Sequence, residues 1–274
     1  MSADNAVPQE APQLPEKTRS NVPLIVGIAV VVALIAAIIF VVTNGGKNDT
    51  TFDNVNVKIG TTDHAYEYWD DLVALAAEEG ITLEVVGFAE YPLPNPALAE
   101  GSIDINGFQH FQYLALHNNN TGDDLQVIGT SYIVPLPLYS TKYADVSEFQ
   151  PGDKVAIPND ATNQARALFV LESAGLISFT GEPEIATPED IDTANSIIEV
   201  HPVEASQTAA LINDPEIAGA VINNNFAKEA GLVEQGPIFA DDPTAASEQA
   251  YINIFAVRAD DLENEALKKI VELY

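Results

Sequence analysis

Residues 87–114 decide the fold, and they read GFAEYPLPNPALAEGSIDINGFQHFQYL. This stretch begins at the end of an apolar strand and passes through a Pro-rich turn. Asn95 is a suitable N-cap and Pro96 a suitable first residue for a short helix, which Gly101 would end. Residues 103–106 then predict a second short strand.

Aromatic and polar side chains follow directly after this strand. Phe108, Gln109 and His110 would lie at its carboxyl end, which is the edge where ligands bind in open α/β sheets. Phe111 and Tyr113 continue the cluster. A mouth that is aromatic with a few polar tips is typical of a pocket for a small molecule.

Strand and helix patterns alternate along the rest of the chain, which indicates a parallel sheet with covering helices. Pro135 and Pro137 make one strand-like segment an edge strand or an extended crossover, and we interpret it as the first passage between two lobes. Strands are expected over 55–60, 81–88, 126–129, 132–139, 154–157, 197–201, 219–222 and 251–257, and helices over 64–79, 114–118, 164–174, 204–213, 223–231 and 262–274.

The composition limits the classes of partner. The chain has 274 residues, 47% of them hydrophobic, which is ample for one or two globular units. It carries 41 acidic and 11 basic residues and a net charge of -30, so we expect it to repel nucleic acid and anionic lipid surfaces. We interpret the acidity as a device for solubility or for a salty environment. A calcium-binding role is disfavoured because the chain has no D-x-[DN]-x-[DN]-G loop.

The N-terminal part predicts a membrane anchor. Residues 1–21 are polar and read as a disordered cytoplasmic tail. Residues 22–43 are uncharged and apolar, and at about 1.5 Å per residue they match a bilayer core of roughly 30 Å. A cleavable signal peptide is the alternative, but its apolar core is only about 7–15 residues long and ends in small residues. Residues 44–52 then form a flexible linker.

The charges on either side of this anchor predict its orientation in the membrane. Lys17 and Arg19 precede it and Lys47 follows it closely, so the positive-inside rule puts the N-terminus in the cytoplasm and the folded part outside.

The chain has no cysteine, which excludes disulfides, thiolate metal sites and lipid attachment at an N-terminal cysteine.

Arg166 stands near the start of the predicted helix 164–174, where a cation does not favour the helix dipole. One interpretation is a bidentate salt bridge to a ligand carboxylate, with Asn163 on the same helical face. The other is an ion pair with one of the many acids of the chain. The sequence alone leaves both open.

Catalytic and metal chemistry are disfavoured. The histidines form no i,i+4 pair and no H-E-x-x-H motif, and stand at His64, His110, His117 and His201. No G-x-S-x-G, P-loop or G-x-G-x-x-G motif is present. We therefore expect no enzyme activity, no metal and no cofactor.

The motifs strongly resemble those of the methionine-binding (MetQ/NlpA) family of solute-binding proteins of ABC importers. Residues 91–114 carry Y-x-L-P-N-x-A-L followed by I-D-x-N-x-F-Q-H-x-x-Y-L, and residues 158–168, PNDATNQARAL, reproduce the family's P-N-D-x-x-N-x-x-R-[AS]-L motif. Residues 220–223, AVIN, and 251–253, YIN, resemble two further motifs. The chain departs from the family in its Phe111-Gln112 pair, in its anchor and in a C-terminus some twenty residues short, which leaves the last helix open.

The resemblance implies roles for eight residues. Arg166, Asn163, Asn223 and Asn253 would hold the polar end of an amino acid, although no acid for the ligand ammonium is identifiable. An Asn among the apolar residues around Asn253 is costly to bury without partners, which supports a site there. The walls near the thioether would be Phe108, His110, Tyr113 and Tyr91.

We therefore expect an α/β, two-lobed periplasmic-binding-protein-like fold with a ligand cleft between the lobes. Lobe 1 would comprise residues 53–137 completed by 251–274, and lobe 2 residues 138–250. The expected function is extracytoplasmic delivery of an amino acid, most simply methionine, to the permease and ATPase subunits of an ABC importer. The alternative is a membrane-tethered sensor or binding domain for another amino acid or a methionyl dipeptide, without a role in transport.

Overall fold

The computed structural model describes residues 52–274, apart from the side chains of Ala246 and Ser247. The predicted tail 1–21, the predicted anchor 22–43 and all but the last residue of the linker 44–52 lie outside the described residues. Within residues 52–274, no helix is long and apolar enough to cross a membrane.

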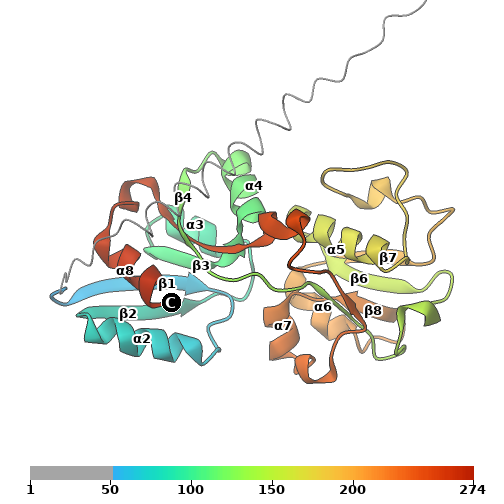
Figure 1. Ribbon diagram of the computed structural model, residues 1–274, viewed down its shortest axis with the longest axis horizontal. Helices are drawn as coiled ribbons and strands as arrows, with labels where there is room; N and C mark the ends of the chain where they lie inside the picture. The colour runs from blue at the N-terminus through green and yellow to red at the C-terminus, as the bar shows by residue number, and fades with distance from the viewer. Residues whose placement is uncertain (1–51) are drawn as a thin grey trace, which may run out of the picture. The chain divides into compact units, whose positions relative to one another are not determined.

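The described chain forms two five-stranded sheets, each with helices packed against it (Figure 1). In the first sheet the order is β2-β1-β3-β10-β4. Its strands are β1 (Val55–Thr61), β2 (Ile81–Gly87), β3 (Ile105–His110), β4 (Leu125–Thr130) and β10 (Asn253–Arg258). Its helices are α2 (Tyr68–Glu78), α3 (Pro94–Ala99), α4 (Phe111–Thr121) and α8 (Glu265–Leu273).

The second sheet repeats this plan in the order β7-β6-β8-β5-β9. Its strands are β5 (Pro137–Tyr139), β6 (Lys154–Pro158), β7 (Glu199–Val203), β8 (Ile217–Val221) and β9 (Phe239–Ala240). Its helices are α5 (Ala161–Ser173), α6 (Ala205–Leu211) and α7 (Asn224–Glu229).

The predicted parallel sheets are found only in part. β1 pairs in parallel with β2 and β3, and β6 pairs in parallel with β7 and β8. β10, however, runs antiparallel between β3 and β4, and β5 runs antiparallel between β8 and β9. These two strands come directly from the segments that connect the sheets, so no crossover helix turns them parallel to their neighbours.

Side-chain alternation along β10 shows how the first sheet is covered on both faces. Phe255 and Val257 pack with residues of α2 and α8, whereas Ile254 and Ala256 pack with residues of α3 and α4. All four are buried. Successive residues of a strand point to opposite faces, so one apolar strand contributes to two helix-covered cores.

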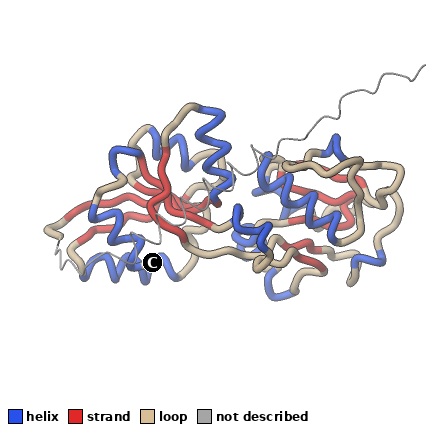
Figure 2. Tube along the Cα trace, turned by 45° about the horizontal axis from the view of Figure 1, so that its top comes forward, coloured by secondary structure: helices blue, strands red, loops and turns tan. Residues whose placement is uncertain are grey.

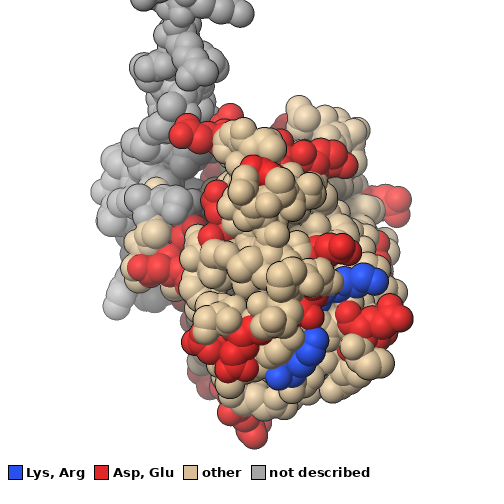
Figure 3. Space-filling model, turned by 90° about the vertical axis from the view of Figure 1, so that its right-hand side faces the viewer, with Lys and Arg blue, Asp and Glu red and all other residues tan. Residues whose placement is uncertain are grey.

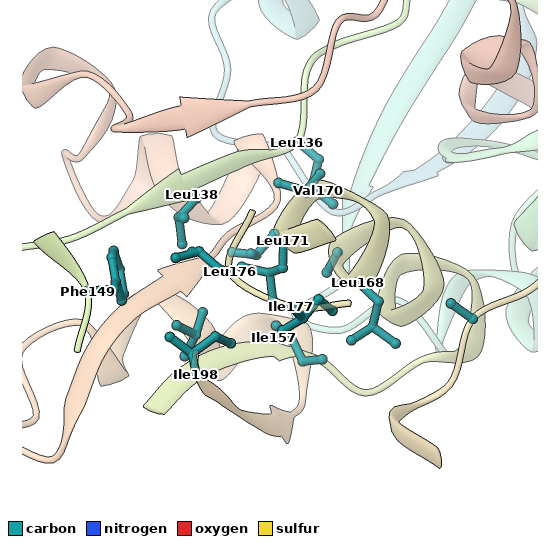
Figure 4. Close-up of a cluster of buried hydrophobic side chains, with 14 of the residues drawn as sticks. Leu136, Leu138, Phe149, Ile157, Leu168, Val170, Leu171, Leu176, Ile177 and Ile198 are labelled. Carbon is teal, nitrogen blue, oxygen red and sulfur yellow. The ribbon is translucent and has the colours of Figure 1, made fainter. Parts of the chain in front are cut away.

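The second sheet packs against α5 in the same way. Figure 4 shows Leu168 and Leu171 of α5 together with Ile157 of β6, and none of the three exposes measurable surface. The opposite face is covered by α6 and α7, whose residues pack against Ala156 and Ala220 of the sheet. Each sheet is thus the middle layer of its own α/β/α arrangement.

Two irregular segments connect the sheets (Figure 2). Residues 131–136 have no regular secondary structure, and residues 241–252 include the 3-10 helix Ala246–Tyr251. The predicted strand 132–139 is therefore an extended crossover that ends in the short β5. The edge-strand alternative is wrong, because β5 has a hydrogen-bonded neighbour on each side.

The structure of residues 87–114 differs in detail from the prediction. α3 begins two residues earlier than expected, at Pro94 instead of Pro96, and Asn95 is a buried helical residue rather than a cap. The Asn95 side chain is used elsewhere, because its amide exchanges hydrogen bonds of 2.8 and 2.7 Å with Gln109 of β3. The predicted strand 103–106 is shifted along the chain, because β3 begins at Ile105, runs on to His110 and leads directly into α4.

The acidic composition is visible on the surface. Figure 3 shows Asp and Glu side chains spread over one face with few Lys or Arg side chains among them. Several Lys and Arg side chains of residues 52–274 form ion pairs, as in Lys142 with Asp153 at 2.9 Å.

Candidate functional site

A cavity of about 240 Å³ lies where the carboxyl ends of strands from both sheets meet. β1, β2 and β3 reach it from the first sheet, and the segments after β6 and β8 reach it from the second. This is the edge at which α/β sheets place their ligands. All eight residues predicted to bind a ligand line this one cavity: Tyr91, Phe108, His110, Tyr113, Asn163, Arg166, Asn223 and Asn253.

The start of α5 supplies a chain of amide and carboxylate groups. Asp160 caps the helix by accepting from the Asn163 backbone N–H at 3.0 Å, and it also accepts from the Asn163 side chain at 2.9 Å. Asn163 Oδ1 in turn accepts from Asn223 Nδ2 at 2.9 Å. Asn223 therefore binds across to α5 and does not cap α7 with its side chain. Burial raises the pKa of Asp160.

Arg166 is buried in α5, with 5% of its surface exposed. Its Nε donates to Asp241 at 2.8 Å and its Nη2 to the carbonyl oxygen of Val134 at 2.8 Å. Glu248 lies 3.4 Å from Nε, and the guanidinium stands 4.5 Å from the centre of the Tyr251 ring. The ion pair that the sequence left open is thus formed, while the same side chain lines the cavity.

His110 is the last residue of β3 and the N-cap of α4. Its Nδ1 accepts from the backbone N–H of Tyr113 at 3.1 Å, so the proton of the neutral ring lies on Nε2. Burial, and next the charge of Arg166, lowers the pKa of His110 to about 3, with Asn163 acting in the opposite direction. Nε2 is buried and has no hydrogen-bond partner of normal geometry within residues 52–274. A neutral donor is therefore available at the cavity wall.

Aromatic rings form the apolar part of the wall. Phe108 and Tyr113 meet edge to face with ring centres 5.8 Å apart, and Tyr91 lies 6.2 Å from Phe108. Phe226 of α7 closes the group, 5.2 Å from Tyr91. Phe111, which the sequence placed in this cluster, packs instead into the core around Leu98 on the far side of β3.

Asn253 is the first residue of β10, and its backbone is hydrogen-bonded to the connecting segment 131–136. Its backbone N–H donates to the Tyr132 carbonyl at 2.8 Å, and its carbonyl accepts from Ser131 at 2.8 Å. In register it stands beside His110 of β3. It is therefore the first residue of a strand rather than an amide within one, and its side chain is partly exposed at the cavity.

Gln109, which the sequence placed at the ligand-binding edge, also lines the cavity. The sequence did not identify the remaining cavity residues: Thr62, Asp63, Tyr66, Tyr68, Tyr132, Val134, Asn224 and Asn225. Thr62 and Asp63 carried a usable signal, since they follow the first predicted strand directly, at its carboxyl end. Tyr132 and Val134 carried none, because their place depends on the path of the crossover.

A family model described as NlpA lipoprotein matches residues 57–274. The chain belongs to this family. The D-methionine-binding lipoprotein MetQ of Yersinia pestis is 34% identical over 247 residues, covering 89% of this chain and 90% of that protein. The family predicted from the motifs is confirmed.

Solved structures of similar chains share the fold. Protein PG110 of Staphylococcus aureus is 39% identical with a TM-score of 0.75, over 80% of this chain and 86% of that one. A nutrient-binding protein from Burkholderia cenocepacia, solved with bound methionine, is 32% identical with a TM-score of 0.73, over 80% and 91% of the two chains. The predicted α/β binding-protein fold with two sheets is confirmed by these likenesses.

Proposed function

We propose that the protein is an extracytoplasmic solute-binding protein that presents methionine, or a closely related amino acid, to an ABC importer. The observation that carries this proposal is the convergence of the eight residues on one small cavity between the two sheets. Relatives named as D-methionine-binding lipoproteins, and a similar structure with bound methionine, support the choice of ligand.

The polar end of the ligand would lie against α5 and α7. A guanidinium carries five N–H donors, and the bonds to Asp241 and Val134 engage Nε and Nη2, so Arg166 is held in place while it faces the cavity. A ligand carboxylate there would gain charge-assisted hydrogen bonds. Asn223 Oδ1 is buried without a hydrogen-bond partner within residues 52–274, which suits an acceptor for one of the three N–H groups of the ligand ammonium.

The side chain of the ligand would lie among Tyr91, Phe108 and Tyr113. Aromatic rings provide a large apolar contact area, and a thioether packs favourably against ring edges. Neutral His110 adds polarity to this wall without adding a charge, because its pKa is lowered to about 3. A charged imidazolium would have to be desolvated beside an apolar side chain, at considerable cost.

Contacts between the two sheets' elements enclose the cavity, as hinge closure around a ligand requires. Tyr91 donates its hydroxyl to Asn225 Oδ1 at 2.6 Å. Lys228 Nζ stands 3.5 Å from the centre of the Tyr66 ring. We propose two lobes with the predicted bounds, residues 53–137 with 251–274 and residues 138–250, except that Pro137 pairs with Ala240 and belongs to the second lobe. The hinge would be the two connecting segments.

The place of the domain in the cell is part of the same proposal. Residues 22–43 would anchor the chain in the membrane once, with the tail 1–21 in the cytoplasm and the binding domain outside, tethered by residues 44–52. Their uncharged apolar composition supports this. An anchored receptor would stay close to its permease.

Calorimetric titration with L-methionine tests the proposal. The full-length chain in mild detergent, unfolded and refolded to remove any carried-over ligand, should bind with a sub-micromolar Kd. Arg166→Ala and Asn253→Ala should each weaken binding by about 10-fold or more, since each removes a hydrogen-bonding group from the site. Arg258→Ala is the control, because Arg258 pairs with Asp261 away from the cavity. Binding of another amino acid or a methionyl dipeptide in place of methionine would favour the alternative ligands.

A further inference from the structure

The cavity has a second polar wall, at Asp63, that the proposed function does not use. Asp63 follows β1 directly, and only 5% of its surface is exposed. It lines the same cavity as Arg166. A buried carboxylate is costly unless it is paired or hydrogen-bonded, so its surroundings require an explanation.

Four donors surround the Asp63 carboxylate. Oδ1 accepts from the Thr61 hydroxyl and, at 2.9 Å, from Trp69 Nε1. Oδ2 accepts from the hydroxyls of Tyr68 and Tyr132, the latter at 3.3 Å. Both oxygens accept, as they do in the ionised form. Within residues 52–274, no Lys, Arg or His side chain lies within 4.0 Å of this carboxylate.

The two tyrosines connect this charge to the cavity. Tyr68 and Tyr132 both line the cavity, and each donates its hydroxyl proton to Asp63. A hydroxyl that donates keeps its lone pairs, and donation to an anion makes its oxygen a better acceptor. The wall of the cavity therefore presents two hydroxyl oxygens backed by a negative charge, an arrangement that suits a protonated amine.

This wall is near the Arg166 end of the cavity. Tyr132 bonds to Asp63, and Val134, two residues further along the same extended segment, accepts from Arg166. At about 3.3–3.6 Å per residue, the two backbone positions are at most roughly 7 Å apart. The cavity thus has a negative and a positive wall that are both fixed to the crossover.

We propose that Asp63, acting through the hydroxyls of Tyr68 and Tyr132, recognises the ammonium group of the ligand and selects zwitterionic ligands over plain carboxylates. This supplies the acid that the sequence analysis could not identify. It rests on the proposed function, since it names the counter-charge for the same ligand in the same site. If Asp63 served only to hold Trp69 and Thr61 in place, its Oδ2 would not need hydroxyl donors from two separate segments.

The test compares two ligands that differ only in the amine. L-Methionine and 4-(methylthio)butanoate are titrated into the full-length wild type, Asp63→Asn and Asp153→Asn, the second ligand by competition. Asp63→Asn should weaken methionine binding about 10- to 100-fold and leave 4-(methylthio)butanoate within about 3-fold, because only methionine loses a charge-assisted contact. Asp153→Asn removes the same charge at a partly exposed ion pair outside the cavity and should change neither affinity.

Tyr132→Phe gives a second test that keeps the Asp63 carboxylate and its other three donors, at a residue that is 39% exposed. It should weaken methionine binding about 3- to 10-fold and leave the amine-free ligand unchanged. Equal losses for both ligands in Asp63→Asn, or no loss in either variant, would overturn the inference while the methionine-binding function stands. A wild type that binds no methionine would overturn the proposed function and this inference with it.

Discussion

The buried histidine at the cavity makes stability depend on pH in a way that can be isolated. His110 has a pKa of about 3 in the folded protein against 6.5 in its ordinary state. Between these values the unfolded chain binds one proton more than the folded chain, so the free energy of unfolding rises with pH. The stability that neutral His110 allows is complete above pH 6.5 and is lost progressively as the pH falls toward 3.

The magnitude follows from the same pKa values. At pH 5, which is about 1.5 units below the unfolded value, protonation of the unfolded chain costs about 2 kcal/mol of stability relative to pH 7. His110→Asn removes the titration and keeps an acceptor for the Tyr113 N–H, because Asn is a favoured N-cap. The wild type should therefore lose about 2 kcal/mol more than His110→Asn between pH 7 and pH 5.

Urea unfolding without ligand measures this difference. Trp69, the single tryptophan, is buried in the core of the first sheet and reports its unfolding. Carboxylates titrate in both chains and cancel, and any cavity left by the smaller Asn is present at both pH values. Equal losses in wild type and His110→Asn would refute the buried neutral state of His110.

Two further predictions concern a hydrogen bond and a close contact. Asn163→Ala and Asn223→Ala should each weaken methionine binding, and the loss in the double variant should be smaller than the sum of the two losses by about 0.5–1.5 kcal/mol. The reason is the hydrogen bond of 2.9 Å between the two side chains. Strictly additive losses would show that this bond does not matter to the site. Gly107→Ala would place a Cβ 2.6 Å from the Phe255 ring and should lower the free energy of unfolding by about 1–3 kcal/mol, and an unchanged urea midpoint would contradict the packing of β3 against β10.

Local signals predicted most of the elements, because strand and helix periodicity are properties of short segments. The failures were cases in which a distant partner decided. Asn95 has the local preference of an N-cap, but Gln109 and Asn106 hold its side chain in a buried amide cluster. The direction of β5 and β10 likewise depends on the crossovers, and hydrophobic periodicity contains no information about strand direction.

The site shows the same division. The motifs indicated eight cavity residues, but not the partners that fix them. Arg166 pairs with Asp241, 75 positions along the chain, and Tyr132 reaches Asp63 across 69 positions. Neither pair has a spacing that a helix or a strand would produce. The sequence could therefore not predict the cavity wall at Asp63, because that wall depends on the path of residues 131–136 between the two sheets.

The most direct test of the central claim is a crystal structure of the protein with L-selenomethionine bound. Protein produced without selenomethionine contains no selenium, so the ligand alone supplies the selenium anomalous signal. We predict a single selenium peak within about 4.5 Å of the Phe108 and Tyr113 rings, with the ligand carboxylate at Arg166. A peak outside this cavity, or a ligand turned with its selenium toward Arg166, would contradict the account of the site.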